Sequence, residues 1–214
     1  MGEFNLAKVL FVQCGGIGWL LWAISLVTIA LIIHFFISIR RSNILPMEVL
    51  EQIRSMFEGK QYREAIDFTA AEPSFISYTI HSALSEASHG YPAMERAMEE
   101  AAEERTTKML RGIEWLNLIG NIGPMLGLMG TVWGMILAFF KIVEAGGMPD
   151  PASLAGAIGV ALVTTLVGLA VAIPSLAVYA ILRNRVDALT SEAMVISQEL
   201  ISTFRPARKQ GAQG

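Results

Sequence analysis

Polar side chains interrupt an otherwise apolar stretch at spacings that bring them to one helical face. Asn117, Asn121 and Thr131 share that face with Pro124 if the stretch is helical. Amide and hydroxyl groups in such surroundings need hydrogen-bond partners or a wet cavity. The pattern therefore predicts either hydrogen bonding between helices or a polar pathway lined by these side chains, and both interpretations stay open.

A second apolar stretch carries Thr165 in the middle of a narrow face of small residues. The members of this face are Ala157, Ala161, Thr165, Gly168, Ala172 and Ser175. Thr164 is rotated by about 100° on a helix, toward Val160, Val167 and Val171. We therefore expect Thr165 to face inward, with Thr164 as the weaker candidate for the same pathway. A hydrogen bond from either hydroxyl back to its own helix is the alternative.

Glycines form a regular stripe beside the first polar face. They recur at spacings of three and four residues, as Gly120, Gly123, Gly127, Gly130 and Gly134. Small residues at such spacings let helices approach closely in lipid. Together with Gly168 and Ala172, we interpret them as packing residues of a multi-helix assembly. Pro124 and Pro174 each free a backbone carbonyl, which predicts a bend or a hydration site at each.

The elements that position these residues are three long stretches without charge. No Asp, Glu, Lys or Arg lies within residues 9–39, 115–140 or 151–182, and a helix crosses a bilayer with about 20 apolar residues. The chain has 214 residues, of which 53% are hydrophobic and 16% charged. A soluble globule, a disordered chain and a secreted disulfide scaffold are excluded.

We expect an all-α polytopic membrane protein with three transmembrane helices. Two of these helices are long and extend into the cytoplasm, where a small helical domain is inserted between the first two spans. The predicted segments are an outer N-terminus (1–14), transmembrane helix 1 (15–39), the cytoplasmic helical domain (40–114), transmembrane helix 2 (115–140), an outer turn (141–152), transmembrane helix 3 (153–182) and a cytoplasmic C-terminal helix and tail (183–214).

Basic residues next to the spans set the expected orientation. Those at the inner ends are Arg40, Arg41, Lys108, Arg111, Arg183 and Arg185, whereas Lys8 and Lys141 flank the outer ends. Because Lys and Arg accumulate in cytoplasmic loops, the N-terminus is expected outside and the C-terminus inside.

Composition and motifs exclude several functional classes. The net charge of −3 gives no case for nucleic-acid binding, and the single cysteine allows no internal disulfide. The three histidines show no metal-ligand spacing. We find no phosphate-binding loop and no nucleophile–base pair, so we expect no metal, no cofactor and no enzyme. Since no Asp, Glu, Lys or Arg lies at depth in a span, a proton pathway would need a charge carrier from another chain.

Two motifs resemble those of a known family. The run from Ile122 to Met135, with Phe139 after it, is similar to the second-span signature of the MotA/TolQ/ExbB proton-channel family, and Ala157 to Thr165, continuing to Pro174, is similar to the third-span signature. The three-span layout resembles the ExbB/TolQ branch. Many ExbB proteins carry Glu where this chain has Val160, which weakens the resemblance to a standard TonB-energising ExbB.

The resemblance implies a homopentamer in the bacterial inner membrane, with the N-terminus periplasmic. Two copies of a single-span ExbD/TolR-like partner would occupy its pore and supply a membrane Asp, beside ring threonines at the positions of Thr131 and Thr165. Proton motive force would then drive mechanical work on the envelope, through TonB for ExbB-like uptake or a TolA-like protein for outer-membrane maintenance. A gliding or secretion motor is a further alternative, and a passive membrane scaffold is the alternative of another class.

Overall fold

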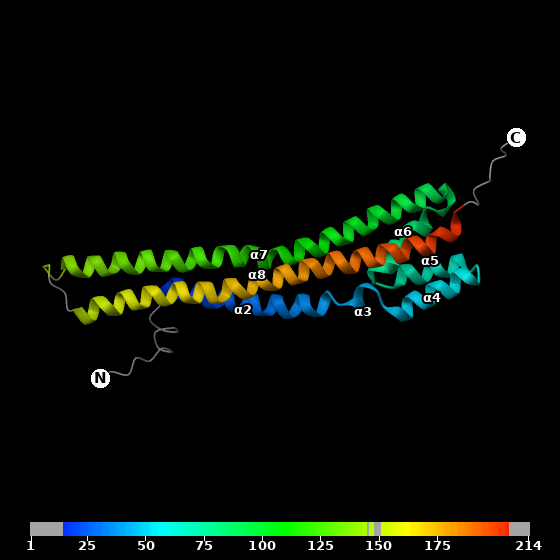
Figure 1. The fold of residues 1–214 in the computed structure, drawn as a ribbon. Coiled ribbons are helices and arrows are strands. Elements are labelled where there is room, and N and C mark those ends of the chain that lie inside the picture. The colour runs from blue at the N-terminus through cyan, green and yellow to red at the C-terminus, as the bar shows by residue number, and fades with distance from the viewer. Residues whose placement is uncertain (1–14, 145, 148–150, 206–214) are drawn as a thin grey trace. The chain divides into compact units, whose positions relative to one another are not determined.

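The structure is a computed structural model that describes residues 15–144, 146–147 and 151–205. The predicted N-terminus (1–14), part of the outer turn and the end of the tail lie outside the described residues. The elements, shown in Figure 1, are α2 (Gly15–Ser38), α3 (Arg41–Ile44), α4 (Met47–Glu58), α5 (Tyr62–Ala71), α6 (Phe75–Ser85), η2 (Ala87–His89), α7 (Tyr91–Glu144), α8 (Pro151–Ile201) and η3 (Ser202–Phe204).

The predicted fold class is confirmed. The described part of the chain has helices and no strand, and α2, α7 and α8 are long and apolar enough to cross a membrane. α7 has 54 residues and α8 has 51, whereas a bilayer core about 30 Å thick needs about 20. α7 starts in the charged segment and continues through Gly112 into the apolar stretch without a break, as the lack of a helix breaker predicts.

Two compact units make up the chain. The apolar unit comprises residues 1–35 and 113–181, and the polar unit comprises residues 36–112 and 182–214. Both α7 and α8 contribute residues to each unit, and each unit is described by itself below.

Amphipathic helices build the polar unit. Leu50, Ile53 and Phe57 recur at helical spacing on α4 and are buried, as their sequence pattern predicts. Met47, which the same pattern assigns to this face, is 53% exposed. On α6, the N–H of Ser77 donates to the hydroxyl of the N-cap residue Ser74 at 3.2 Å, which satisfies one of the free donors of a helix start.

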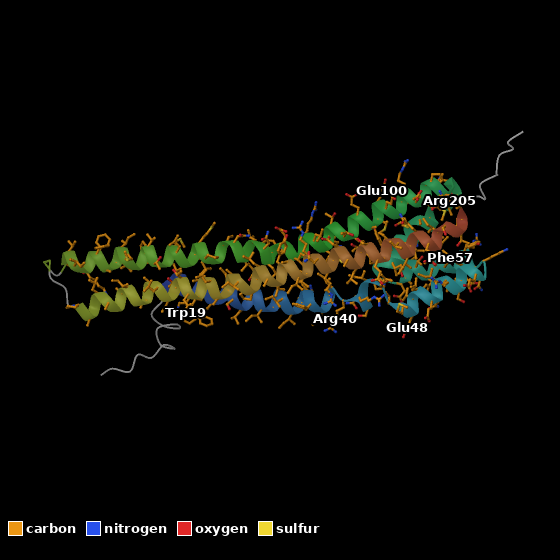
Figure 2. The ribbon with its side chains drawn as sticks, in the orientation of Figure 1. Trp19, Arg40, Glu48, Phe57, Glu100 and Arg205 are labelled. Atoms are coloured by element: carbon orange, nitrogen blue, oxygen red, sulfur yellow. The ribbon has the colours of Figure 1, made fainter. Side chains whose placement is uncertain are left out.

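Buried contacts join segments of the polar unit that are far apart in sequence. Its large, fully buried side chains include Ile53, Ile76, Ile80, Met94, Met98, Val186 and Ile201. Thr79 on α6 and Ser197 on α8 share a buried hydrogen bond of 3.1 Å between their hydroxyls. The ring of Phe204 lies edge-to-face at 5.6 Å from that of Phe57, labelled in Figure 2, and tilted at 4.9 Å from that of Tyr62. The short helix η3 that follows α8 is therefore packed against α4 and α5 through aromatic contacts.

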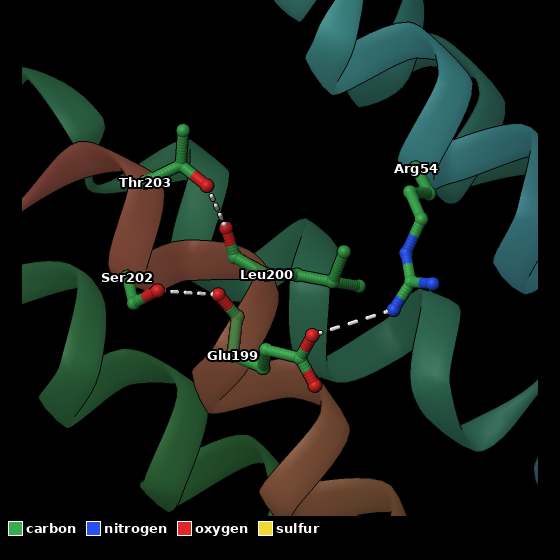
Figure 3. A network of polar contacts seen from close by, with 5 residues as sticks. All are labelled: Arg54, Glu199, Leu200, Ser202 and Thr203. Atoms are coloured by element: carbon green, nitrogen blue, oxygen red, sulfur yellow. Dashed lines mark hydrogen bonds and ion pairs between the residues drawn. The ribbon is translucent and has the colours of Figure 1, made fainter.

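The C-terminal end of α8 satisfies its carbonyls with nearby hydroxyls, as Figure 3 shows. Ser202 donates to the carbonyl of Glu199 at 2.6 Å, and Thr203 donates to that of Leu200 at 3.0 Å. Such carbonyls have no partner within the helix. The ion pair of Arg54 and Glu199, 3.5 Å apart, is largely exposed and contributes little to stability.

Tyr78 provides a test of the packing of α6 against α7. Its hydroxyl donates to Glu104 at 2.9 Å, and this hydrogen bond, with partial desolvation and the Glu104 charge, raises the pKa of Tyr78, although Arg105 opposes the shift. The tyrosinate absorbance of Tyr78 is obtained as the difference between the wild type and Tyr78→Phe. We expect its midpoint to lie above the usual tyrosine pKa of about 10. Glu104→Gln is expected to lower that midpoint, and Glu103→Gln to leave it unchanged.

The linked effect on stability has a defined sign. Because the folded pKa is raised, this contribution is fully present below the unfolded pKa and is lost as the pH rises through the folded value. Near neutral pH this contribution is therefore fully present and does not change with pH. A Glu104→Gln protein whose Tyr78 still titrates like the wild type would contradict the contact.

The apolar unit exposes many large apolar side chains. On α2 these include Trp19, marked in Figure 2 and 64% exposed, and Leu26 and Ile33. Leu21 is fully buried, and Thr28 satisfies its hydroxyl by donating to the carbonyl of Ile24 at 2.8 Å. A helix with so few buried positions and with its polar group satisfied internally is suited to contact with lipid.

Candidate functional site

The candidate site lies within the apolar unit, along the seam where α7 and α8 pack against each other. The helices are antiparallel: Gly120 faces Leu176 at one end of the seam and Gly134 faces Ala161 at the other. All five glycines of the stripe on α7 lie against α8. Their absent side chains allow the close approach that the spacing predicts.

The middle of the seam is a contact between two backbones. A Cβ built on Gly168 would lie 2.6 Å from the carbonyl oxygen of Gly123 and 3.2 Å from the Cα of Gly127. One built on Gly127 would lie 2.9 Å from the Cα of Thr165. Backbone atoms cannot rotate out of the way, so no larger residue fits at either position without moving a helix.

The two adjacent threonines of α8 occupy different places in this seam. Thr164 is 3% exposed and packs against Gly130, where a Cβ would collide with its side chain. Its hydroxyl donates to the carbonyl of Ala161 at 2.7 Å. Thr165 is half-buried, and its hydroxyl donates across the seam to the carbonyl of Gly127 at 3.1 Å.

This arrangement differs from the expected face of small residues. The sequence places Thr165 at the centre of the packed face, but the buried positions of α8 run through Ala161, Thr164, Gly168, Ala172 and Ser175. Both threonines fit a spacing of three or four from Ala161 and Gly168. Thr164 takes the buried position because its side chain fills the space beside Gly130. Thr165 therefore lies at the edge of the seam within this chain.

Thr131 lies on α7 one turn beyond Gly127. Its side chain is half-buried, and its hydroxyl donates to the carbonyl of Leu128 at 2.7 Å. A threonine bonded to its own helix keeps two lone pairs on the hydroxyl oxygen as acceptors. Thr131 can therefore accept a hydrogen bond from water or from another chain without unfolding α7.

Pro124 and Pro174 both lie inside continuous helices. Proline has no N–H to donate to the residue four positions earlier, so the carbonyls of Gly120 and Ala170 lack their helical donors. Pro124 is half-buried and Pro174 is exposed. The helices continue through both positions, so any bend there is local.

Asn117 and Asn121 belong to a connected set of polar side chains. The Asn121 amide donates to the side-chain oxygen of Asn117 at 2.9 Å and to its backbone carbonyl at 2.8 Å. The Asn117 amide donates in turn to Glu114 Oε1 at 2.6 Å. From α8, the Tyr179 hydroxyl donates to Glu114 Oε2 at 3.0 Å. We call these four residues the Glu114 network.

Sequence reasoning missed Glu114 and Tyr179 as members of this site. Glu114 borders the second charge-free stretch and precedes Asn117 by one helical turn, which is the available signal. Tyr179 is 65 residues away from Glu114, so only the packing of α8 against α7 reveals its role. Within the described ranges, no three His, Cys, Asp or Glu side chains form a group that could hold a metal ion.

A family comparison matches the part of the chain that builds this seam. Residues 70–194 fit the family described as the MotA/TolQ/ExbB proton channel family. The chain belongs to the MotA/TolQ/ExbB proton channel family. The matched residues include Thr131, Thr164, Thr165, Glu114 and Tyr179. This is a family of channels rather than of enzymes.

Individual relatives of this MotA/TolQ/ExbB family member carry ExbB names. A putative biopolymer transport protein ExbB homolog of Methanothermobacter thermautotrophicus is 31% identical over 86% of this chain and 65% of its own length. Biopolymer transport protein exbB1 of Vibrio cholerae is 29% identical over 77% of this chain and 74% of its own. Biopolymer transport protein ExbB of Xanthomonas campestris is 40% identical over 38% of this chain. The chain thus spans 65% of the first relative and 32% of the last.

Proposed function

We propose that this chain is the proton-conducting subunit of an ExbB-like energising complex. It would couple proton motive force to mechanical work on the cell envelope, for TonB-dependent uptake. The observation that carries this proposal is the pair of hydroxyls at Thr131 on α7 and Thr165 in the seam. No carboxylate or amine lies within either charge-free stretch, and the chain is one of a proton channel family. The ExbB names of several relatives support ExbB over TolQ for this chain.

The missing charge argues for a partner. Proton pathways in membranes normally contain an ionisable side chain, and no Asp, Glu, Lys or Arg lies between residues 115 and 140 or between 151 and 182. A single-span ExbD/TolR-like chain with a membrane Asp would supply it. In the proposed complex, two such chains stand inside a pentamer of this subunit, so that the carboxylate faces the threonines.

The exposed apolar surface of α7 supports assembly around such a partner. Trp115, Met125, Leu128, Phe139 and Val143 are each at least 59% exposed in the single chain. Side chains of this size need lipid or another protein surface in contact with them. We propose that further copies of this chain cover part of that surface and that lipid covers the remainder.

Orientation and energy are consistent with this role. Six of the eight basic residues next to the spans lie at the ends expected inside and two lie at the other ends, so we propose that the N-terminus is periplasmic and the C-terminus is cytoplasmic. Each charge that crosses the membrane releases about 2.3 kcal/mol per 100 mV. A few protons per cycle would therefore suffice for a mechanical step.

Proton flux into liposomes tests the proposal. The chain, purified with its co-expressed single-span partner, is reconstituted with an internal pH-sensitive dye under an imposed pH gradient. We expect flux well above that of empty liposomes, and a loss of this flux when the partner's membrane Asp is replaced by Asn. A stable complex that conducts no better than empty liposomes would instead support a passive scaffold.

A further inference from the structure

The Glu114 network has a direction. Every donor in it points toward the Glu114 carboxylate, because Asn121 donates to Asn117, Asn117 donates to Oε1, and Tyr179 donates to Oε2. Among the described residues, no Lys, Arg or His nitrogen lies within 4.0 Å of this carboxylate. Its partners are therefore an amide and a phenol, and no ion pair among the described residues includes it.

The two carboxylate oxygens differ in what protonation would require. The Asn117 amide nitrogen can only donate, so a proton on Oε1 would face another donor. The Tyr179 hydroxyl can donate or accept, so a rotation about its C–O bond turns it from donor to acceptor. A proton can therefore bind Oε2 and donate to the Tyr179 oxygen, while the bond from Asn117 to Oε1 remains.

We propose that Glu114 and Tyr179 form a proton-exchange site at the end of the α7–α8 seam. In one step, a hydronium ion in the pathway gives its proton to Glu114 Oε2 and leaves as water. In the reverse step, the neutral carboxylic acid returns the proton to water on the inner side and the Tyr179 hydroxyl donates again. This inference rests on the proposed proton conduction and assigns its exit to a carboxylate of this chain.

The position of the network on α7 fits such an exit. Asn117 and Asn121 continue the face from Glu114 toward Thr131, which lies ten residues or about 15 Å beyond Asn121 along the helix. Water would fill that interval. The Gly120 carbonyl, which lacks its helical donor because of Pro124, would accept a hydrogen bond from this water. The neighbouring charged residues in the sequence are Arg111 on α7 and Arg183 on α8, one turn from Glu114 and Tyr179 respectively.

The experiment compares Glu114→Gln with the wild-type complex in the same liposome assay. Glutamine has the shape of glutamate: its oxygen can accept from Asn117, and its amide can donate to the Tyr179 oxygen. The fold is therefore retained, but no proton can be exchanged. We expect at least a tenfold loss of flux per assembled complex and a flat dependence on inner pH. The matched control is Glu103→Gln, an exposed carboxylate on the same helix, which should conduct like the wild type.

Tyr179→Phe tests the positioning role of the phenol. It removes the donor to Oε2 and keeps the carboxylate, so we expect flux to persist with a dependence on inner pH that differs from that of the wild type. Wild-type flux and pH profile in Glu114→Gln would overturn the inference. So would a loss of assembled complex with unchanged flux per complex, because both residues would then serve packing alone. A wild-type complex without flux would instead refute the proposed function.

Discussion

Gly168→Ala is expected to weaken the packing of α7 against α8. The added methyl carbon would lie 2.6 Å from the carbonyl oxygen of Gly123 and 3.2 Å from the Cα of Gly127, and neither atom can move without its helix. Overpacking of a rigid site costs about 1–3 kcal/mol, which exceeds the gain of about 1 kcal/mol from helix propensity of alanine over glycine. We expect a lower midpoint of thermal unfolding in detergent and a loss of the assembled oligomer in size-exclusion chromatography.

The same helix provides the control for this prediction. Gly159 lies about two and a half turns earlier on α8, and a Cβ built there meets nothing within 4 Å. Gly159→Ala is therefore expected to fold and assemble like the wild type or slightly better. If Gly168→Ala were as stable as Gly159→Ala, the close approach of the two backbones would be wrong.

Replacement of Thr131 or Thr165 by valine is expected to stop proton conduction in an assembled complex. Valine keeps the shape of threonine and removes the hydroxyl. At Thr131, the lost bond is one to its own helix, so the fold should not change. At Thr165, the lost bond crosses the seam to Gly127 and costs about 1 kcal/mol. We expect flux to fall at least tenfold in each variant, which is about 1.4 kcal/mol in barrier height.

Two further variants separate the hydroxyl from the packing. Thr131→Ser and Thr165→Ser keep the oxygen and should retain most of the flux. Thr164→Val should lower stability, since it removes the buried hydroxyl that donates to the carbonyl of Ala161, but should leave the flux per assembled complex unchanged. Normal conduction in both Thr131→Val and Thr165→Val would refute the hydroxyl pathway, and conduction lost only in Thr164→Val would move it to that residue.

Local patterns sufficed to predict the helices but not which residues meet across them. Charge-free length predicts the membrane helices, and the lack of any breaker other than Gly112 before the second stretch predicts a continuous α7, because both depend on neighbours in sequence. The choice between Thr164 and Thr165 depends on the rotation of α8 about its axis, which the space above Gly130 decides. The contact of Tyr179 with Glu114 depends on the register of two antiparallel helices, and one sequence does not contain that information.

The carbonyl of Gly127 has a consequence for how such a complex could move. In helix α7 it lies opposite the backbone N–H of Thr131, and it also accepts the hydroxyl of Thr165 from α8. One oxygen thus links the two threonines of the proposed pathway. The backbone contacts around it, at Gly127 and Gly168, are too close to allow either helix to shift toward the other. Sliding α8 along α7 by a single residue would break this link and drive backbone atoms into one another. In the proposed complex, α7 and α8 of each subunit should therefore move together as one rigid body. Any rotation would then have to take place at the boundaries between chains.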